Sequence, residues 1–286
     1  MKPNLTRFIS AWLLLLSPAF GYAGFEEGKA AMLNRDFSKA MHEFTPLAEK
    51  GDAKSQHIVG MMYDEGQGVA QSYEQASKWY NKAATQGYVD AQYNLGVMYA
   101  QGQGVTRDDK ISANWFKKAA RQGHALSQFA LGRLYTVGRG VMQDDKEAAK
   151  WYRKAAEQGH YKAQLVLGGL YIEGRGVSKN EQEGAQWVSK SAEQGHLKAQ
   201  YALAQLYRDG RGVPKNAVIA YALYDVASRD GHVAATRERD ALITQMSAEH
   251  IAQGKLLAAQ WQKAAPIKIP TTKTLTTKPP QKAQQN

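Results

Sequence analysis

The sequence predicts an all-α protein built as an α-solenoid, a stack of helix-turn-helix repeats. Three observations lead to this fold class. A glycine recurs at a fixed step of 36 residues, each step contains two short segments with apolar residues at helical spacing, and no proline interrupts residues 47–213. A single hairpin of this kind cannot bury its apolar face, so the copies are expected to stack on one another. The recurring glycines are Gly51, Gly87, Gly123, Gly159, Gly195 and Gly231.

The first helix of each copy follows from its apolar spacing and from the glycine that ends it. In the third copy the spacing predicts an amphipathic helix over residues 126–136. Gly138 is expected to end it, because glycine adopts a positive φ without steric penalty at a helix C-terminus. A glutamine recurs within this helix in five copies, and the set is Gln56, Gln92, Gln128, Gln164 and Gln200.

The second helix of each copy starts at a residue whose side chain can cap it. Such a side chain accepts a hydrogen bond from a free N–H of the first turn and stabilises the helix by about 1 kcal/mol. In the third copy Gly159 ends this helix, whose apolar stripe consists of Ala148, Trp151, Tyr152, Ala155 and Ala156. The capping residues are Ser72, Asp108, Asp144, Asn180 and Asn216.

Small residues in the first helices indicate where neighbouring helices approach closely. We expect them to face the bulky tryptophan that recurs in the second helices. The small residues are Gly60, Gly96, Gly132, Gly168 and, in the fifth copy, Ala204. The tryptophans are Trp79, Trp115, Trp151 and Trp187, and Leu223 takes this place in the fifth copy.

The stretch from Gly123 to Gly159 resembles the Sel1-like repeat, a 36-residue relative of the tetratricopeptide repeat. It carries the L-G-x-x-Y-x-x-G-x-G-V and A-x-x-W-Y-x-K-A-A elements of that pattern, and five consecutive copies cover residues 51–230. The departures are Leu223, Ala204 and Gly184, which stand in place of Trp, Gly and Ala. The resemblance implies a right-handed superhelical scaffold that binds proteins or peptides, and bacterial members are often exported.

Residues 1–23 read as a secretory signal peptide. Lys2 and Arg7 precede an apolar run over residues 8–20, and small residues precede a cleavage point near Gly24. We therefore expect a periplasmic or secreted protein. The alternative is a membrane anchor that stays attached. The chain contains no cysteine, which excludes a lipid-modified N-terminal cysteine, disulfides and any Cys-ligated metal site.

The remaining segments flank the repeats. Residues 24–50 are expected to form an N-terminal capping hairpin, in which Pro46 would kink the second helix or force its last turn to re-form. Residues 231–265 are expected to form C-terminal capping helices, with 256–261 covering the stack. Residues 266–286 read as a disordered basic tail of Pro, Thr, Lys and Gln.

Charge does not indicate a nucleic-acid partner. The chain carries 37 basic and 26 acidic residues, a net charge of +11, and subtracting the two basic residues of the signal and the four lysines of the tail leaves +5. A charge of that size is ordinary for a soluble domain. The tail is expected either to make weak contacts with anionic envelope surfaces or to be a solvated terminus.

The sequence predicts no catalytic residue, no metal site and no cofactor. Histidines recur at 36-residue steps, so they form a ladder along the stack, and we interpret them as residues at helix starts. The Gly-x-Gly elements lie between helices, where they serve turns and not phosphates. Asp108 and Asp144 cap helices, which favours their charged form and not the protonated form of a general acid. The histidines are His124, His160, His196 and His232.

Two rows on the first helices change identity between copies, and we predict that they bind the partner. They follow the recurrent glutamine directly and one turn later, so they form one stripe. The alternative is that this stripe packs between adjacent first helices. A separate ladder of Arg139, Arg175 and Arg211 in the turns is expected either to be solvated or to contact acidic groups. The stripe consists of His57, Met61, Tyr93, Val97, Phe129, Arg133, Leu165, Tyr201 and Gln205, with Gly169 at the equivalent place in the fourth copy.

Two functional hypotheses follow. The first is an exported, non-enzymatic scaffold that binds a protein or peptide of the cell envelope through the concave face of the solenoid. The second is a binder or hydrolase of cell-wall peptides or β-lactam-type ligands, by analogy with disulfide-rich Sel1-like relatives. A shared fold alone is a weak argument for a shared activity.

Overall fold

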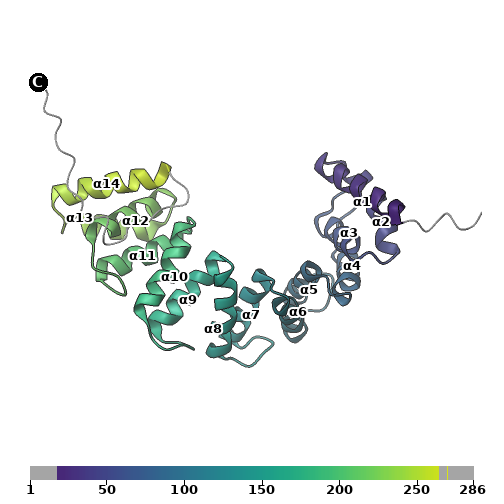
Figure 1. Ribbon diagram of the computed structural model, residues 1–286, viewed down its shortest axis with the longest axis horizontal. Coiled ribbons are helices and arrows are strands. Elements are labelled where there is room, and N and C mark those ends of the chain that lie inside the picture. Colours follow the sequence, from purple (N-terminus) through teal and green to yellow (C-terminus); the bar gives the residue numbers. More distant parts are fainter. Residues whose placement is uncertain (1–17, 264–268, 270–286) are drawn as a thin grey trace, which may run out of the picture. The chain divides into compact units, whose positions relative to one another are not determined.

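The computed structural model describes residues 18–263 and 269, with side chains for 24–261 and 269. This part of the chain consists of fourteen α-helices and contains no strand (Figure 1). The helices follow one another as hairpins, and within each of two compact units consecutive hairpins pack together. The predicted all-α solenoid of helix-turn-helix repeats is thus confirmed. The chain divides into two compact units, which meet in sequence at Gln122 and Gly123.

The first unit contains six described helices, and each of the first five packs against the next along the chain. Their bounds are α1 Pro18–Leu33, α2 Phe37–Glu49, α3 Ala53–Glu65, α4 Tyr73–Thr85, α5 Val89–Gln101 and α6 Asp109–Arg121. In the leading hairpin the rings of Phe25 and Phe44 meet edge to face, with centroids 5.4 Å apart. Pro46 lies inside α2, which continues to Glu49. The residues expected to form a signal peptide lie outside the described part, apart from the backbone of 18–23 in α1.

The second unit contains eight described helices. Their bounds are α7 Ala125–Val137, α8 Asp145–Glu157, α9 Tyr161–Glu173, α10 Glu181–Glu193, α11 Leu197–Asp209, α12 Ala217–Arg229, α13 Val233–Ile243 and α14 Ala248–Lys263. Helices α7 to α12 form three hairpins of the repeat. The expected tail lies outside the described residues except for Ile269, which is half-buried against the core around α12.

Local sequence signals end and begin the helices as expected. Gly138 ends α7 with a φ of +67°, in the left-handed region. Asp144 begins α8, and its Oδ1 accepts hydrogen bonds from the backbone N–H groups of Lys146 (2.8 Å) and Glu147 (3.0 Å). Gly138 and Asp144 fix the turn between α7 and α8, and the equivalent residues do so in the other repeats.

The second glycine of the Gly-x-Gly element brings consecutive repeats together. A Cβ on Gly176 would lie 2.0 Å from the carbonyl oxygen of Asp145, the first residue of the second helix one repeat earlier. Gly212 stands in the same relation to Glu181, also at 2.0 Å. No other residue allows the turn to approach that backbone so closely, so this glycine serves the junction between repeats.

The predicted pairing of small residues with tryptophan is wrong. A Cβ on Gly132 would lie 2.8 Å from the ring of Tyr152, and one on Gly60 would lie 2.7 Å from that of Tyr80. The ring against the glycine thus belongs to the residue after the tryptophan. The tryptophan itself packs where the preceding repeat meets its own, as Trp115 does on the core formed by α4 and α5.

A ladder of glutamine pairs lies at the repeat junctions. The recurrent glutamine of each first helix is buried, and Gln164 Nε2 donates to the carbonyl oxygen of Ala156 in the previous repeat (3.1 Å). Its Oε1 then accepts from Nε2 of Gln194, the last residue of its own repeat (2.7 Å). The other pairs of this glutamine ladder are Gln86 with Gln56 (2.8 Å), Gln122 with Gln92 (2.9 Å) and Gln158 with Gln128 (2.7 Å).

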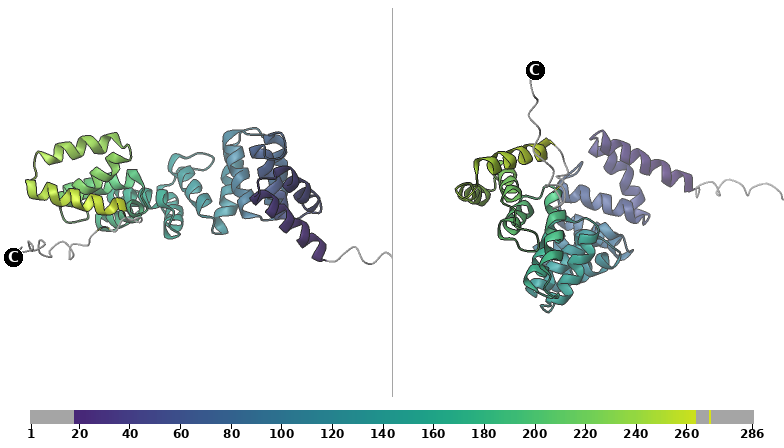
Figure 2. Two further views of the ribbon diagram at one scale, coloured as in Figure 1. Left: turned by 90° about the horizontal axis from the view of Figure 1, so that it is seen from above. Right: turned by 60° about the vertical axis from the view of Figure 1, so that its left-hand side comes forward.

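Helix α12 lies at the centre of the C-terminal helices and is buried on nearly every side. Nine consecutive residues, 219–227, are buried, because α11, α13 and α14 all pack against this helix (Figures 1 and 2). Gly254 of α14 lies on Tyr221, and Trp261 is buried beside it in the same core. Leu256, which was expected to take part in this cover, instead points to solvent and is 62% exposed.

Candidate partner-binding surface

The first helices expose one face, and its residues differ from repeat to repeat. In α7 this face contains Leu126, Ala130, Arg133 and Val137, spaced so that they lie in one line along the helix. The equivalent residues of α9 are Lys162, Val166, Gly169 and Glu173, and those of α11 are Lys198, Ala202, Gln205 and Asp209. In the first unit they are Lys54, Ile58, Met61 and Glu65 on α3, and Asp90, Asn94, Val97 and Gln101 on α5.

One row of the predicted stripe lies at the edge of this face and takes part in packing. The ring of Phe129 lies 5.7 Å from that of Tyr152 in its own repeat and stacks on His160 of the next repeat at 4.6 Å. Tyr201 makes the same two contacts, with Tyr224 (5.8 Å) and His232 (4.5 Å). These contacts support the alternative interpretation, in which this row packs between neighbouring repeats. The row consists of His57, Tyr93, Phe129, Leu165 and Tyr201, of which His57 is buried and the others are half-buried.

The other row of the stripe lies on the exposed face itself. Arg133 is exposed, and Met61, Val97, Gly169 and Gln205 are half-buried. Gln205 Nε2 donates to the Tyr201 hydroxyl (3.1 Å), which ties the two rows together in α11. Within each unit, the structure places the residues that the sequence predicted along the first helices, and it divides them into a packed row and an accessible row.

The predicted stripe did not include the outermost positions of the face. Leu126 and Val137 are 45% and 65% exposed. Leu126 lies two turns before Arg133 and Val137 one turn after it, on the same side of α7. The sequence alone could have indicated these positions, because on a helix the residues three or four places before and after an exposed residue lie on the same face.

His57 is the polar member of the packed row. Its Nε2 lies 3.1 Å from Nδ2 of Asn94 in the next repeat, and its ring lies 5.0 Å from that of Tyr88. Burial lowers the pKa of His57, an effect that the nearby Asp90 partly offsets. A neutral imidazole accepts the Asn94 hydrogen bond, so the contact depends on the neutral form of His57.

The recurring histidines have the structural role that we expected from their position. Each is the N-terminal cap of a first helix, and His160 Nδ1 accepts from the backbone N–H of Ala163 (3.1 Å). Burial lowers the pKa of His160 and of His196. Within the described residues no three His, Asp or Glu side chains are grouped so that they could bind a metal ion.

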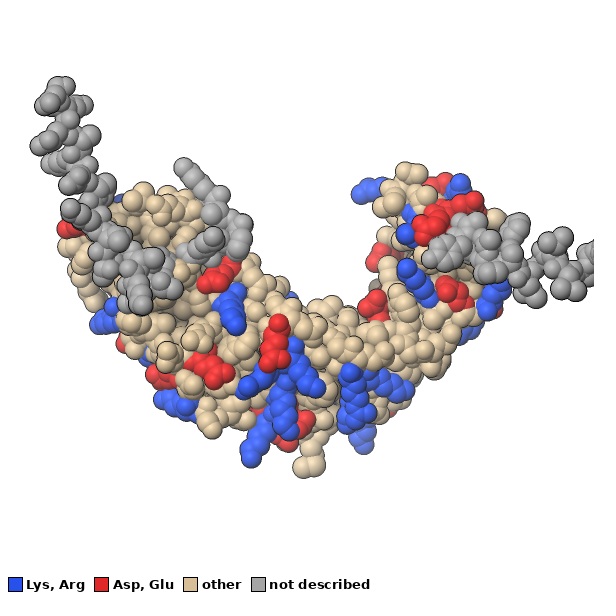
Figure 3. Space-filling model, viewed as in Figure 1, with Lys and Arg blue, Asp and Glu red and all other residues tan. Residues whose placement is uncertain are grey.

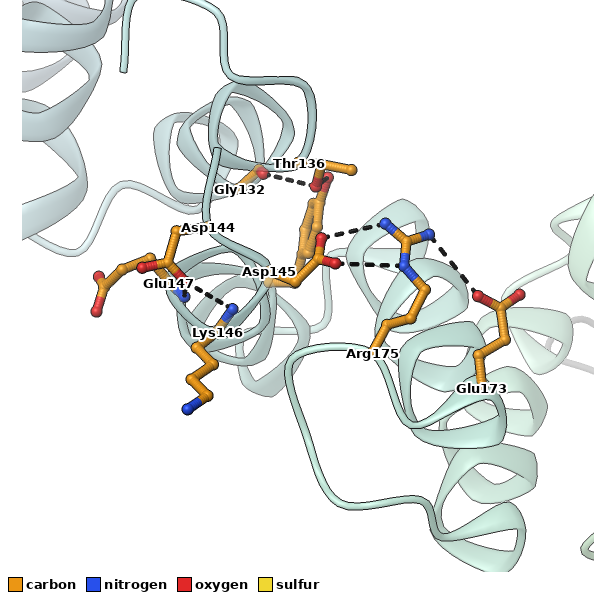
Figure 4. A network of polar contacts seen from close by, with 9 residues as sticks. Gly132, Thr136, Asp144, Asp145, Lys146, Glu147, Glu173 and Arg175 are labelled. Carbon is orange, nitrogen blue, oxygen red and sulfur yellow. Dashed lines mark hydrogen bonds and ion pairs between the residues drawn. The ribbon is translucent and has the colours of Figure 1, made fainter. Parts of the chain in front are cut away.

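Two arginines of the turn ladder form ion pairs across repeat junctions, so the solvated alternative is wrong for them. Arg175 Nη2 lies 3.1 Å from Asp145 Oδ1, and its Nη1 lies 3.7 Å from Glu173 (Figure 4). Arg211 lies 3.3 Å from Glu181 in the same way. These pairs are largely exposed to solvent, so screening by water leaves each only a small contribution to the junction.

The second helices carry a different surface, which is basic. Lys and Arg side chains gather over α6 and, in the other unit, over α8 (Figure 3). A lysine three residues after each tryptophan lies over its indole ring, as Lys118 does over Trp115 at 3.9 Å. The lysines therefore shield the outer faces of the indoles. The sequence signal was the recurrence of Lys82, Lys118, Lys154 and Lys190 at the repeat step.

A shallow hollow of about 560 Å³ opens in the second unit between the turns that precede α11 and α13. Tyr161, His196, Lys198 and His232 line it together with the turn glycines. Of the residues that line the hollow, only Lys198 also belongs to the exposed face of the first helices. Among the described helices, none combines the length and hydropathy needed to span a bilayer.

Comparison with known proteins identifies the repeat. The family model described as Sel1 repeat matches residues 53–88, 89–124, 125–160, 162–196 and 197–232. A crystal structure of a Sel1 repeat protein from Oxalobacter formigenes is similar, with 30% sequence identity, coverage of 87% of this chain and 98% of that one, and a TM-score of 0.71. A protective antigen of uropathogenic Escherichia coli strains with an SLR fold shows 26% identity, 88% and 80% coverage, and a TM-score of 0.45. No curated protein sequence matches the chain.

Proposed function

Because this chain belongs to the Sel1 repeat family, whose solenoids commonly serve as protein-interaction scaffolds, we propose that it is a non-enzymatic scaffold. It holds a protein or peptide partner on the exposed face of its first helices. The proposal includes export, with residues 1–23 as a cleaved signal peptide and a partner in the periplasm or outside the cell.

One observation supports the choice of surface. Buried positions of the first helices repeat the same residue, such as Leu95, Leu131, Leu167 and Leu203 at equivalent places. The exposed positions of the same helices do not repeat, and they range from Met61 to Arg133 to Gly169. Packing requires equivalent residues at equivalent places, whereas recognition of one particular partner requires different residues along the array. The variation therefore fits a surface with a partner of its own.

The titratable side chains that invited a catalytic interpretation have structural partners. Asp108 and Asp144 accept backbone hydrogen bonds at helix starts, and His160 does the same. The alternative of a cell-wall peptide or β-lactam-type ligand depended on disulfide-rich relatives. This chain contains no cysteine, so that analogy does not extend to it.

The experiment compares two triple variants of residues 24–286 in affinity purification from the envelope fraction of the native cells. The first changes Leu126, Arg133 and Val137 to Ala, all on the exposed face of α7. The control changes Lys146, Lys150 and Glu157 to Ala on the exposed side of α8. We expect only the first to lose the proteins that co-purify with the wild type, while both melt like the wild type.

Export is tested on its own. We expect N-terminal sequencing of the protein from the periplasm or medium to begin near Gly24. Recovery of chains that retain Met1 in the membrane fraction would support the anchor instead.

In the affinity purification, loss of co-purifying proteins in the α8 control alone would overturn the proposed surface.

A further inference from the structure

We propose that the exposed face of α7, together with the adjoining part of α9, binds a partner segment with apolar side chains and one carboxylate that pairs with Arg133. This inference rests on the proposed function and names the chemistry of its partner. It depends on three features: an apolar line on α7, an arginine without an ion-pair partner, and a glycine that packing does not require.

The apolar line distinguishes α7 from the other first helices of its unit. Its exposed face presents Leu126, Ala130 and Val137, with Arg133 as the single charge. The same positions of α9 and α11 each include a lysine and an acidic residue. A surface helix normally presents polar residues to water, so exposed Leu126 and Val137 on one line indicate a surface that a partner covers.

Arg133 is the charge that this face offers. It forms no ion pair with any acidic side chain in the described part of the chain, and it lies among apolar neighbours of its own helix. Arg175 and Arg211, in contrast, each pair with an acid of the preceding repeat. A guanidinium at the centre of an apolar surface can bind a carboxylate through two parallel hydrogen bonds, and a partner that excludes water strengthens them.

Gly169 opens the backbone of α9 at the place equivalent to Arg133. A Cβ added there would meet no atom within 4 Å. Its neighbour Gly168 is required, because a Cβ would lie 2.6 Å from Val188. A glycine inside a helix destabilises it relative to alanine. Since packing does not explain Gly169, the open backbone is suited to a chain that approaches α9 closely while its carboxylate reaches Arg133.

Charge excludes the chain's own C-terminal segment as the occupant. Residues 266–286 contain four lysines and no acidic side chain, so Arg133 would repel them. We therefore assign the surface to a separate partner, and the chemistry expected of its bound segment is apolar residues around one Asp or Glu.

The test uses a displayed library of random dodecapeptides selected on immobilised residues 24–286. We expect the selected peptides to share an acidic residue with apolar neighbours. Arg133→Glu should weaken their binding about thirtyfold, the effect typical of a central interface arginine. Gly169→Leu should weaken it as well, while Arg121→Glu, the same change at an exposed arginine of α6, should leave binding unchanged.

Gly169→Ala separates binding from folding. It should raise the thermal midpoint, because the added methyl group meets no neighbour, and weaken the peptides less than Gly169→Leu does. A variant that is more stable and yet binds more weakly cannot owe its loss to misfolding.

The outcomes distinguish this inference from the proposed function. If the selected peptides fail to bind the α7 triple variant but still bind the Arg133→Glu and Gly169→Leu variants, the inference is overturned and the proposed surface stands. Peptides that bind the α7 variant normally, or a library that yields no binder, would count against both. Self-association of the wild type that Arg133→Glu abolishes would overturn a separate partner in favour of a second copy.

Discussion

The fourth and fifth repeats end differently, and the difference shows what a repeat junction requires. In the fourth repeat Gln194 donates to the buried Gln164, whereas in the fifth the last residue is Asp230 and the buried Gln200 Oε1 has no donor within the described residues. The fourth repeat is followed by another repeat, while the second helix of the fifth is covered by α14. The glutamine pair therefore belongs to repeats that another repeat follows, and apolar cover closes the array.

The largest expected effect lies in the apolar cover. Trp261→Ala should lower the free energy of unfolding by about 3–5 kcal/mol, because it removes a buried aromatic ring from the contact between α14 and α12. Chemical denaturation followed by circular dichroism would measure it. Leu256→Ala, on the exposed side of α14, is the control and should change little. Equal effects of the two variants would show that α14 does not cover α12 as described.

The polar contact should contribute less. Gln194→Ala leaves Oε1 of the buried Gln164 without its donor, which should cost about 1–3 kcal/mol. Gln186→Ala, on the exposed side of α10, is the matched control. If both variants share the wild-type denaturation midpoint, the glutamine ladder does not stabilise the junction.

Two adjacent glycines of α9 sharpen the comparison within one helix. Gly168→Ala imitates Ala204 of the fifth repeat, but in the fourth its methyl group would meet Val188 and the Gly184 carbonyl oxygen, so we expect a loss of about 1–3 kcal/mol. Gly169→Ala should stabilise the protein by about 0.5–1 kcal/mol. Thermal unfolding of both variants measures the contrast, and two shifts of the same sign would contradict the packing described for α9 and α10.

A smaller gain is expected from repairing the fifth junction. Asp230→Gln would place an amide where the other repeats have one and would give Gln200 Oε1 a donor. Completing one hydrogen bond should stabilise the protein by about 0.5–1.5 kcal/mol. Asp230→Ala separates this gain from the mere removal of a charge at the C-terminus of α12. Equal midpoints for the Gln and Ala variants would attribute any gain to the charge alone.

The smallest effect concerns the first junction and pH. Burial lowers the pKa of His57 from 6.5, so the unfolded chain takes up a proton at a higher pH than the folded one. Stability is thus complete above that value and falls as the pH drops below it. His57→Tyr, which imitates Tyr93, should reduce the loss of thermal midpoint between about pH 7.5 and about pH 5.5. An unchanged loss would show that His57 does not contribute.

Local features were predictable from the sequence, because each depends on a few neighbouring residues. The caps, the left-handed glycines and the helical hairpins follow from such local chemistry, as Asp144 and Gly138 illustrate. The partner of the small residues was not predictable in this way. Trp151 and Tyr152 differ by one position, and only the crossing of the two helices decides which ring meets Gly132.

The candidate surface was predicted in part for a related reason. Spacing placed Arg133 and Gln205 on one stripe, but it could not tell that Phe129 and Tyr201 stack on the histidines that begin the next repeat. That contact joins residues about one repeat apart in sequence, so it depends on how repeats stack. The glutamine ladder escaped prediction in the same way, since Gln158 and Gln128 recur visibly but meet only in the folded array.

The glutamine ladder also affects how the number of repeats in such a protein can change during evolution. Each rung joins residues 30 positions apart, and every bond of a junction lies within two consecutive repeats. Loss of residues 159–194 would place Gly195 directly after Gln158, and Gln200 would then meet Ala156 in place of Ala192. Duplication or deletion of one 36-residue segment of the gene would thus leave each remaining junction chemically intact. The span offered to a partner can therefore evolve in whole repeats, without any compensating substitution.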